Sequence, residues 1–156
     1  MDLLAFAEWC ESTGLGLIVR ESIWLFPVIE AVHLLGLSML GGVVLVVDLR
    51  MLGAGLVGTP AALLARQLRP WLTASIVAMV ATGVLLFLSE AVKCYYSQAF
   101  WVKIVTFPIA IAFTYAVRQR VAESESTTAT TGALVAVTSL ALWLVVAAAG
   151  RWIGFS

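Results

Sequence analysis

The chain is poor in charge and nearly devoid of histidine and cysteine. Of its 156 residues, 12% are charged, one is a histidine and two are cysteines. Soluble domains carry about 25% charged residues, so this chain has too little polar surface to cover a soluble globule. Its nine basic and nine acidic residues give a formal net charge of zero, and no basic patch or arm favours a nucleic-acid partner.

The sequence also lacks the short motifs that carry enzymatic chemistry. It contains no nucleophile elbow, P-loop, HExxH or GxGxxG pattern. Its two cysteines, Cys10 and Cys94, do not have the spacing of a zinc or iron–sulfur site, which needs clustered thiolates. We therefore expect a protein that is not an enzyme, and the sequence predicts no metal ligands.

What the chain does have is long apolar runs, with 62% hydrophobic residues overall. Crossing a bilayer takes about 20 helical residues. Four runs approach or exceed that length, at about 23–47, 71–89, 100–117 and 132–153. Residues 2–12 carry apolar side chains at helical spacing, which predicts a short amphipathic helix in the membrane interface. The sequence thus predicts one all-α domain over residues 1–156, a four-helix up-down transmembrane bundle preceded by a short interfacial helix.

The basic residues indicate how the chain is oriented in the membrane. With the N-terminus outside, the inner connections carry five basic residues: Arg50, Arg66, Arg69, Arg118 and Arg120. The outer segments carry four: Arg20, Lys93, Lys103 and Arg151. The positive-inside rule then predicts both termini outside a bacterial inner membrane. In that oxidising compartment Cys10 and Cys94 could form a disulfide that ties the N-terminal helix to the second connection.

A set of ionisable residues is expected at membrane depth, where such groups are costly. In an up-down bundle, the starts of the first and third spans share a leaflet with the ends of the second and fourth. Each span places one charge in that leaflet, which gives a predicted polar layer of Glu30, Glu90, Lys103 and Arg151. His33 follows Glu30 by one helical turn and joins the layer. We expect Glu30 to lie within ion-pair distance of Lys103 or Arg151.

The polar layer has two interpretations. It is either an ion-pair lock that fixes the register of the helices in lipid, or the wall of a wet pocket in which His33 takes up a proton or binds a ligand. A second set of charges lies at the opposite face: Asp48, Arg50, Arg66 and Arg69. We interpret this second set as membrane-surface anchors, with Asp48 paired to Arg66 or Arg69.

Three functional classes fit this pattern. In the first, Glu30 and His33 form a relay for protons, ions or small solutes, and the path needs an oligomer because four short spans make a poor pore alone. In the second, the protein binds haem b or a metal through His33, with Met39, Met79 or the His33 of a second copy as the other axial ligand. In the third, it is an accessory subunit of a larger membrane complex.

Several segments carry a family resemblance. They are ESIWLFPVIEAVHLLGLSMLGGVVLVVDLRMLG, LRPW, LLFLSEAVKCYYSQAFWVK and LALWLVVAAAGRWIGF, and the most specific parts are E-x-x-H-L-L-G and V-D-L-R. Together they resemble an uncharacterised bacterial family of small four-span integral membrane proteins with a domain-of-unknown-function label. The resemblance implies the four-span fold and singles out the positions Glu30, His33, Asp48, Arg50, Glu90, Lys103 and Arg151.

The resemblance supplies no activity. Some family members carry a histidine near the position of Tyr115, and the tyrosine here disfavours a bis-histidine haem site within one chain. We therefore predict a non-enzymatic membrane component, either an oligomer or a complex subunit, with a buried protonatable layer that could serve an ion, proton or small-solute pathway. The alternative is a haem- or metal-binding electron-transfer protein that uses His33. Its partners are expected to be the lipid bilayer and copies of itself or other membrane subunits.

Overall fold

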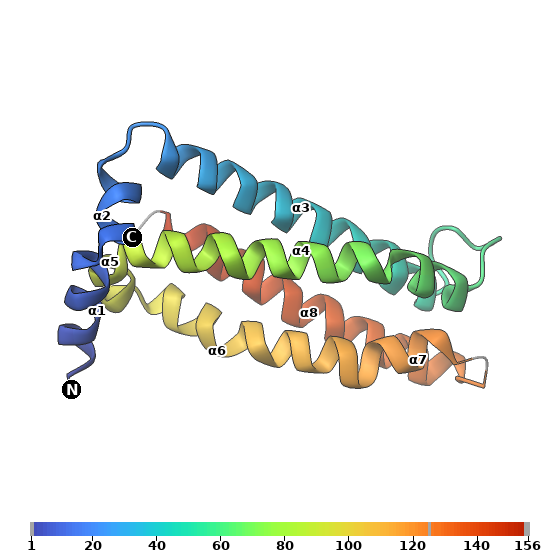
Figure 1. Cartoon of the computed structure of the whole chain (residues 1–156). Helices are drawn as coiled ribbons and strands as arrows, with labels where there is room; N and C mark the ends of the chain where they lie inside the picture. The colour runs from blue at the N-terminus through green and yellow to red at the C-terminus, as the bar shows by residue number, and fades with distance from the viewer. Residues whose placement is uncertain (1, 125, 155–156) are drawn as a thin grey trace.

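The computed structural model describes residues 2–124 and 126–154, and all of the regular structure in them is helical. The elements in chain order are α1 (Leu3–Ser12), α2 (Gly14–Glu21), α3 (Leu25–Met51), α4 (Ala61–Ser89), α5 (Ala91–Tyr96), α6 (Gln98–Phe113), η1 (Thr114–Arg118), α7 (Gln119–Glu123) and α8 (Ala129–Ile153). Four stretches are long and apolar enough to cross a membrane: α3, α4, the continuous run from α6 through η1 to α7, and α8. They run alternately up and down (Figure 1). The predicted fold class is confirmed.

The observed helices are longer than the apolar runs that predicted them. The second span begins at Ala61 rather than near 71, and the third continues to Glu123 rather than ending near 117. Hydropathy locates the segment that sits in lipid, whereas arginine and glutamine are good helix formers and extend a helix beyond it. In α4 the added turns carry Arg66, Gln67 and Arg69, all of them exposed.

The two ends of the bundle are built differently. At one end, which we call the terminal end, α1, α2 and α5 lie across the bundle and pack against α4 (Figure 1). The other end, the loop end, carries the connection at 52–60 and the start of α8. The short helix expected over residues 2–12 is therefore present as α1, and a second short helix, α2, follows it before the first span. Between the ends lies an apolar core formed by Leu40, Val43, Val44, Leu72, Ile76, Met79, Ala110, Trp143 and Val146.

Glu11 holds the terminal-end helices together. Its Oε1 accepts a hydrogen bond of 2.8 Å from the backbone N–H of Val92, which lies in the first turn of α5. Its Oε2 forms an ion pair of 3.0 Å with Nη1 of Arg20 in α2. The first turn of a helix has N–H groups without intrahelical partners. The carboxylate of Glu11 on α1 therefore accepts from one such N–H group of α5 and also forms an ion pair with the arginine of α2.

Cys10 of α1 and Cys94 of α5 are both buried, and both are free thiols. The predicted disulfide between Cys10 and Cys94 is not formed in this structure; packing of α1 on α5 through Ala7, Cys10 and Ala91 links the two segments instead. Burial raises the pKa of the Cys10 thiol. Burial, with a smaller contribution from the Glu90 carboxylate, raises the pKa of Cys94 to about 11. Because the thiolate is the reactive form, both thiols are expected to be inert at neutral pH.

Gly16 makes the closest approach between α2 and α4. A Cβ atom at this position would lie 2.5 Å from the carbonyl oxygen of Leu88 and 3.0 Å from that of Cys10. Both are backbone atoms, which cannot rotate away as a side chain can. Only a glycine therefore lets α2 seat against the end of α4.

We expect Gly16→Ala to lower the free energy of unfolding by about 1–3 kcal/mol, the usual effect of forcing an extra carbon into a packed contact. Thermal unfolding in a mild detergent would measure the change. Gly14→Ala is the matched control, because it lies in the same helix and has no atom within 4 Å of its Cβ position. Equal stability of the Gly16 variant and wild type would contradict the close contact of α2 with α4.

A second prediction concerns thiol reactivity. At pH 8 a group with a pKa of about 11 is ionised to about 0.1%, against about 20% for an ordinary cysteine. Cys94 in the Cys10→Ser variant should therefore react with a thiol reagent at least ~100-fold more slowly in the folded protein than after unfolding in SDS. The rate should rise steadily as the pH is raised toward 11. Rapid labelling of the folded protein at pH 8 would refute the buried position, and absence of any free thiol in the unreduced wild type would show that the disulfide forms.

Candidate functional site

His33 lies inside the bundle and contacts two other spans. Its side chain projects from α3 and is half-buried. The ring nitrogen Nδ1 is 2.7 Å from Oγ1 of Thr82 on α4. The other ring nitrogen, Nε2, is 3.5 Å from Nζ of Lys103 on α6. The only histidine of the chain therefore lies on α3 and contacts side chains of α4 and α6.

The fourth span contributes a glycine to the same place. A Cβ atom on Gly150 of α8 would lie 3.3 Å from Lys103 Nζ, and a Cβ atom on Gly83 of α4 would lie 3.5 Å from Cε1 of His33. The contact at Gly150 is tight, so this glycine leaves room for the lysine side chain, whereas a Cβ atom on Gly83 would make only an ordinary van der Waals contact with the histidine ring. We call the group of Thr82, His33 and Lys103, with these two glycines beside it, the His33–Lys103 centre.

The structure brings together only part of the predicted polar layer. His33 and Lys103 meet, but Glu30 is exposed and forms no hydrogen bond or ion pair with any residue that the structure describes. The expectation that Glu30 pairs with Lys103 or Arg151 is therefore wrong. Glu90 is half-buried at the junction of α4 and α5, and Arg151 is exposed in the last turn of α8. Neither belongs to the His33–Lys103 centre.

Helix geometry explains why Glu30 and His33 separate. Successive residues of an α-helix are rotated by about 100°, so three residues leave Glu30 about 60° away from His33 around α3. Glu30 precedes Asp48 by 18 residues, which is about five whole turns, so these two side chains project from the same side of α3. At the Asp48 level that side is covered by the bundle, whereas at the Glu30 level it is exposed.

A second polar centre lies near the loop end. Nε of Arg118 and Oδ1 of Asp48 form an ion pair of 2.6 Å, with the two side chains 1% and 0% exposed. Nη2 of the same arginine donates a hydrogen bond of 3.2 Å to the carbonyl oxygen of Val44. We call Asp48, Arg118 and the adjacent Ser139 the Asp48–Arg118 centre. Ser139 on α8 is completely buried, and neither its Oγ nor Asp48 Oδ2 has a hydrogen-bond partner among the described residues.

The second set of charges is therefore not a set of surface anchors in the way predicted. Arg66 and Arg69 are exposed on α4, and the partner of Asp48 is Arg118. Arg50 stays at the surface of the loop end, where its Nε donates a hydrogen bond of 2.6 Å to the Thr59 carbonyl in the connection after α3. Asp48 is thus the one member of this set that lies inside the protein.

The π-helical segment η1 directs the side chain of Arg118 into the bundle. Over Thr114–Arg118 the hydrogen bonds reach back five residues, as from the N–H of Gln119 to the carbonyl of Thr114. The wider turn shifts the helical register, so that Arg118 reaches α3 while Gln119 donates to the Ala65 carbonyl of α4 at 3.0 Å. Nε1 of Trp143 on α8 donates a hydrogen bond of 3.0 Å to Oγ1 of Thr114, the first residue of this turn. Such turns recur at functional sites of membrane and soluble helices.

The residues do not fit a haem within one chain. The lysine ammonium group already stands 3.5 Å from His33 Nε2, and Nδ1 is taken by Thr82, so neither nitrogen faces a space that would admit iron. Met79 is buried with its sulfur 3.6 Å from the Cβ position of Gly36. Tyr115 shares a hydrogen bond of 2.8 Å with Thr73. Among the described residues, no three His, Cys, Asp or Glu side chains are grouped as metal ligands.

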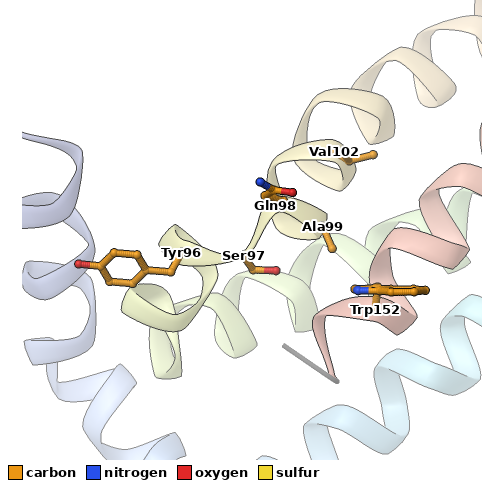
Figure 2. A pocket seen from close by; sticks show the side chains of 6 residues that line it. All are labelled: Tyr96, Ser97, Gln98, Ala99, Val102 and Trp152. Carbon is orange, nitrogen blue, oxygen red and sulfur yellow. The ribbon is translucent and has the colours of Figure 1, made fainter.

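A surface hollow at the terminal end lies apart from both centres. It has a volume of about 390 Å³ and is lined by Tyr96, Ser97, Gln98, Ala99, Val102 and Trp152. Figure 2 shows Trp152 of α8 close to Ala99 at the start of α6, with Tyr96 pointing away from the hollow. Trp152 is 69% exposed and Tyr96 is 70% exposed, as in the aromatic belt that membrane proteins place at the lipid–water interface.

Comparisons with known proteins define the family but no activity. Neither the curated proteins nor the solved structures contain a match to this chain. A family model does match, and it covers residues 6–156, which include every residue of the two polar centres. The chain belongs to DUF6644, a family of unknown function.

Proposed function

We propose that this protein is a non-enzymatic membrane component that binds a proton at the His33–Lys103 centre. The observation that carries the proposal is the distance of 3.5 Å between Lys103 Nζ and His33 Nε2 inside the bundle. Two nitrogen bases so close together can hand a proton from one to the other. The proposal places the centre toward the outer face of a bacterial inner membrane, with both termini outside.

The charges around the pair support single-proton occupancy. Two positive charges 3.5 Å apart repel by about 5 kcal/mol at an effective dielectric constant of about 20. No carboxylate of the described residues lies within ion-pair distance of Lys103 to offset this repulsion. A centre that carries one positive charge is therefore favoured over one that carries two.

The rest of the bundle supports a site at one end rather than an open pore. His33 and Asp48 are 15 residues apart on α3, or about 22 Å along the helix. The apolar core of Leu40, Val44, Ile76 and Met79 fills the space between them. No continuous chain of hydrogen bonds between described residues links His33 to Asp48, so a pathway across the membrane would need a second protein surface.

The exposed side of α3 supports association with another copy or another membrane subunit. Glu30 is exposed and has no charge partner among the described residues, and an ionisable group that faces lipid is costly. Further along α3, Gly41 and Gly42 are exposed, with no atom within 4 Å of either Cβ position. Small residues let two helices approach closely in lipid. A partner at this face would cover Glu30 and contact these glycines.

We predict that Lys103→Met increases the fraction of His33 present as imidazolium at about pH 6, because the ammonium charge no longer opposes it. Nitrogen NMR of histidine-labelled protein in lipid bilayers reports this fraction for a single residue, since His33 is the only histidine. Lys93→Met is the matched control, because Lys93 is exposed on α5. An unchanged fraction in Lys103→Met would refute the shared site. Proton flux into liposomes that is the same for wild type and His33→Ala would separately exclude a pathway through His33.

We also predict that Glu30→Ala and Gly41→Leu each reduce self-association in lipid nanodiscs or co-purification of a membrane partner by about fivefold or more, the effect of losing about 1 kcal/mol of contact energy. Glu8→Ala is the control, because Glu8 is exposed on α1, outside the spans. Single-molecule photobleaching gives the copy number, and mass spectrometry gives the partners. A wild-type protein that is monomeric and free of partners would refute this part of the proposal.

A further inference from the structure

The hydroxyl group of Thr82 donates its single hydrogen to a backbone carbonyl group and not to His33. Thr82 Oγ1 is 2.6 Å from the carbonyl oxygen of Ala78, one turn earlier on α4, and donates to it. A hydroxyl has one hydrogen to donate and two lone pairs that accept. Toward His33, whose Nδ1 is 2.7 Å away, the threonine oxygen can therefore only accept.

This assignment fixes the tautomer of His33. Because Thr82 can only accept, Nδ1 must carry the hydrogen of the contact. In a neutral imidazole one ring nitrogen carries hydrogen and the other holds a lone pair. The lone pair is therefore on Nε2, which faces the ammonium group of Lys103 at 3.5 Å. Ala78, Thr82, His33 and Lys103 then form one directional chain in which each donor meets an acceptor.

The surroundings contribute few other titratable groups. From α4 the neighbours are Thr82 and Gly83, and from α8 the neighbour is Gly150; none of these side chains titrates. From α6 comes Lys103, which interacts electrostatically with the Cys94 thiol of α5. On α3 the nearest acid is Glu30, one turn away and exposed.

We propose that Thr82 is a positioning residue that holds His33 in the Nδ1–H tautomer, so that the centre exchanges one proton between Lys103 Nζ and His33 Nε2. In this step an N–H bond of the ammonium breaks and its electron pair stays on Nζ. The lone pair of Nε2 forms the new N–H bond, and the positive charge moves from the lysine to the imidazole. No helix has to move, and the bonds from Nδ1 to Thr82 and from Thr82 to Ala78 are kept. This inference rests on the proposed function for its purpose, but its geometry can be tested alone.

The test is nitrogen NMR of histidine-labelled protein in lipid bilayers, at a pH high enough for His33 to be neutral. Wild type should show the Nδ1–H tautomer as the main species. Thr82→Val has nearly the same shape without the acceptor, and it should shift the tautomer ratio toward Nε2–H by about fivefold to tenfold, the effect of losing one hydrogen bond. Thr82→Ser restores the hydroxyl and should restore the wild-type ratio.

Thr73→Val is the matched control for the loss of a threonine from α4. Thr73 also donates to a carbonyl one turn earlier, that of Arg69 at 3.1 Å, but its other contact is Tyr115, so the His33 ratio should not change. A wild-type spectrum dominated by Nε2–H overturns the inference without any variant, even if Thr82→Val fails to fold. The expected tautomers together with no response to Lys103→Met would leave the positioning role intact and refute the proton-binding function instead.

Discussion

The arrangement of the loop end depends on the buried ion pair between Asp48 and Arg118. In lipid, a charged side chain is stable only when it is paired inside the protein, and these two side chains are almost completely shielded. The pair joins the first and third spans, which do not follow one another in the chain. Removing one partner of such a pair typically costs about 3–5 kcal/mol. The relative register of these two spans is therefore tied to one contact.

The same requirement for internal pairing separates the two ends of the bundle. Near the loop end an acid and a base neutralise each other, and the apolar core isolates that pair from the rest of the protein. Near the terminal end the two contacting groups, His33 and Lys103, are both bases, and the acid that lies within one turn of them, Glu30, faces outward. The charges of the molecule are thus balanced overall but not locally. The local imbalance lies at the only histidine of the chain.

The sequence predicted the candidate membrane spans well and the pairing of charges poorly. Long apolar runs locate spans because the bilayer fixes their length, and the short helix before the first span followed from the helical spacing of its apolar residues. Pairing depends on which way each side chain projects, and a rotation of about 60° between Glu30 and His33 is enough to send one outward and the other inward. The sequence analysis placed Arg118 in an inner connection. The sequence contains no signal that predicts the π-helical turn, and this turn brings Arg118 to Asp48. Thr82, Gly83 and Gly150 acquire a role only through their neighbours.

The residues that form an ion-pair lock are not those of the predicted polar layer. An ion-pair lock requires opposite charges in contact, and the Asp48–Arg118 centre meets that requirement at 2.6 Å. The His33–Lys103 centre does not, because it brings together two bases and no carboxylate of the described residues pairs with either of them. Its contacts are nevertheless specific: one ring nitrogen at Thr82, the other at Lys103, and a glycine beside each of the two basic side chains. Under the proposed function, one proton held between these two bases accounts for both the contact of Lys103 with Nε2 and the contact of Thr82 with Nδ1.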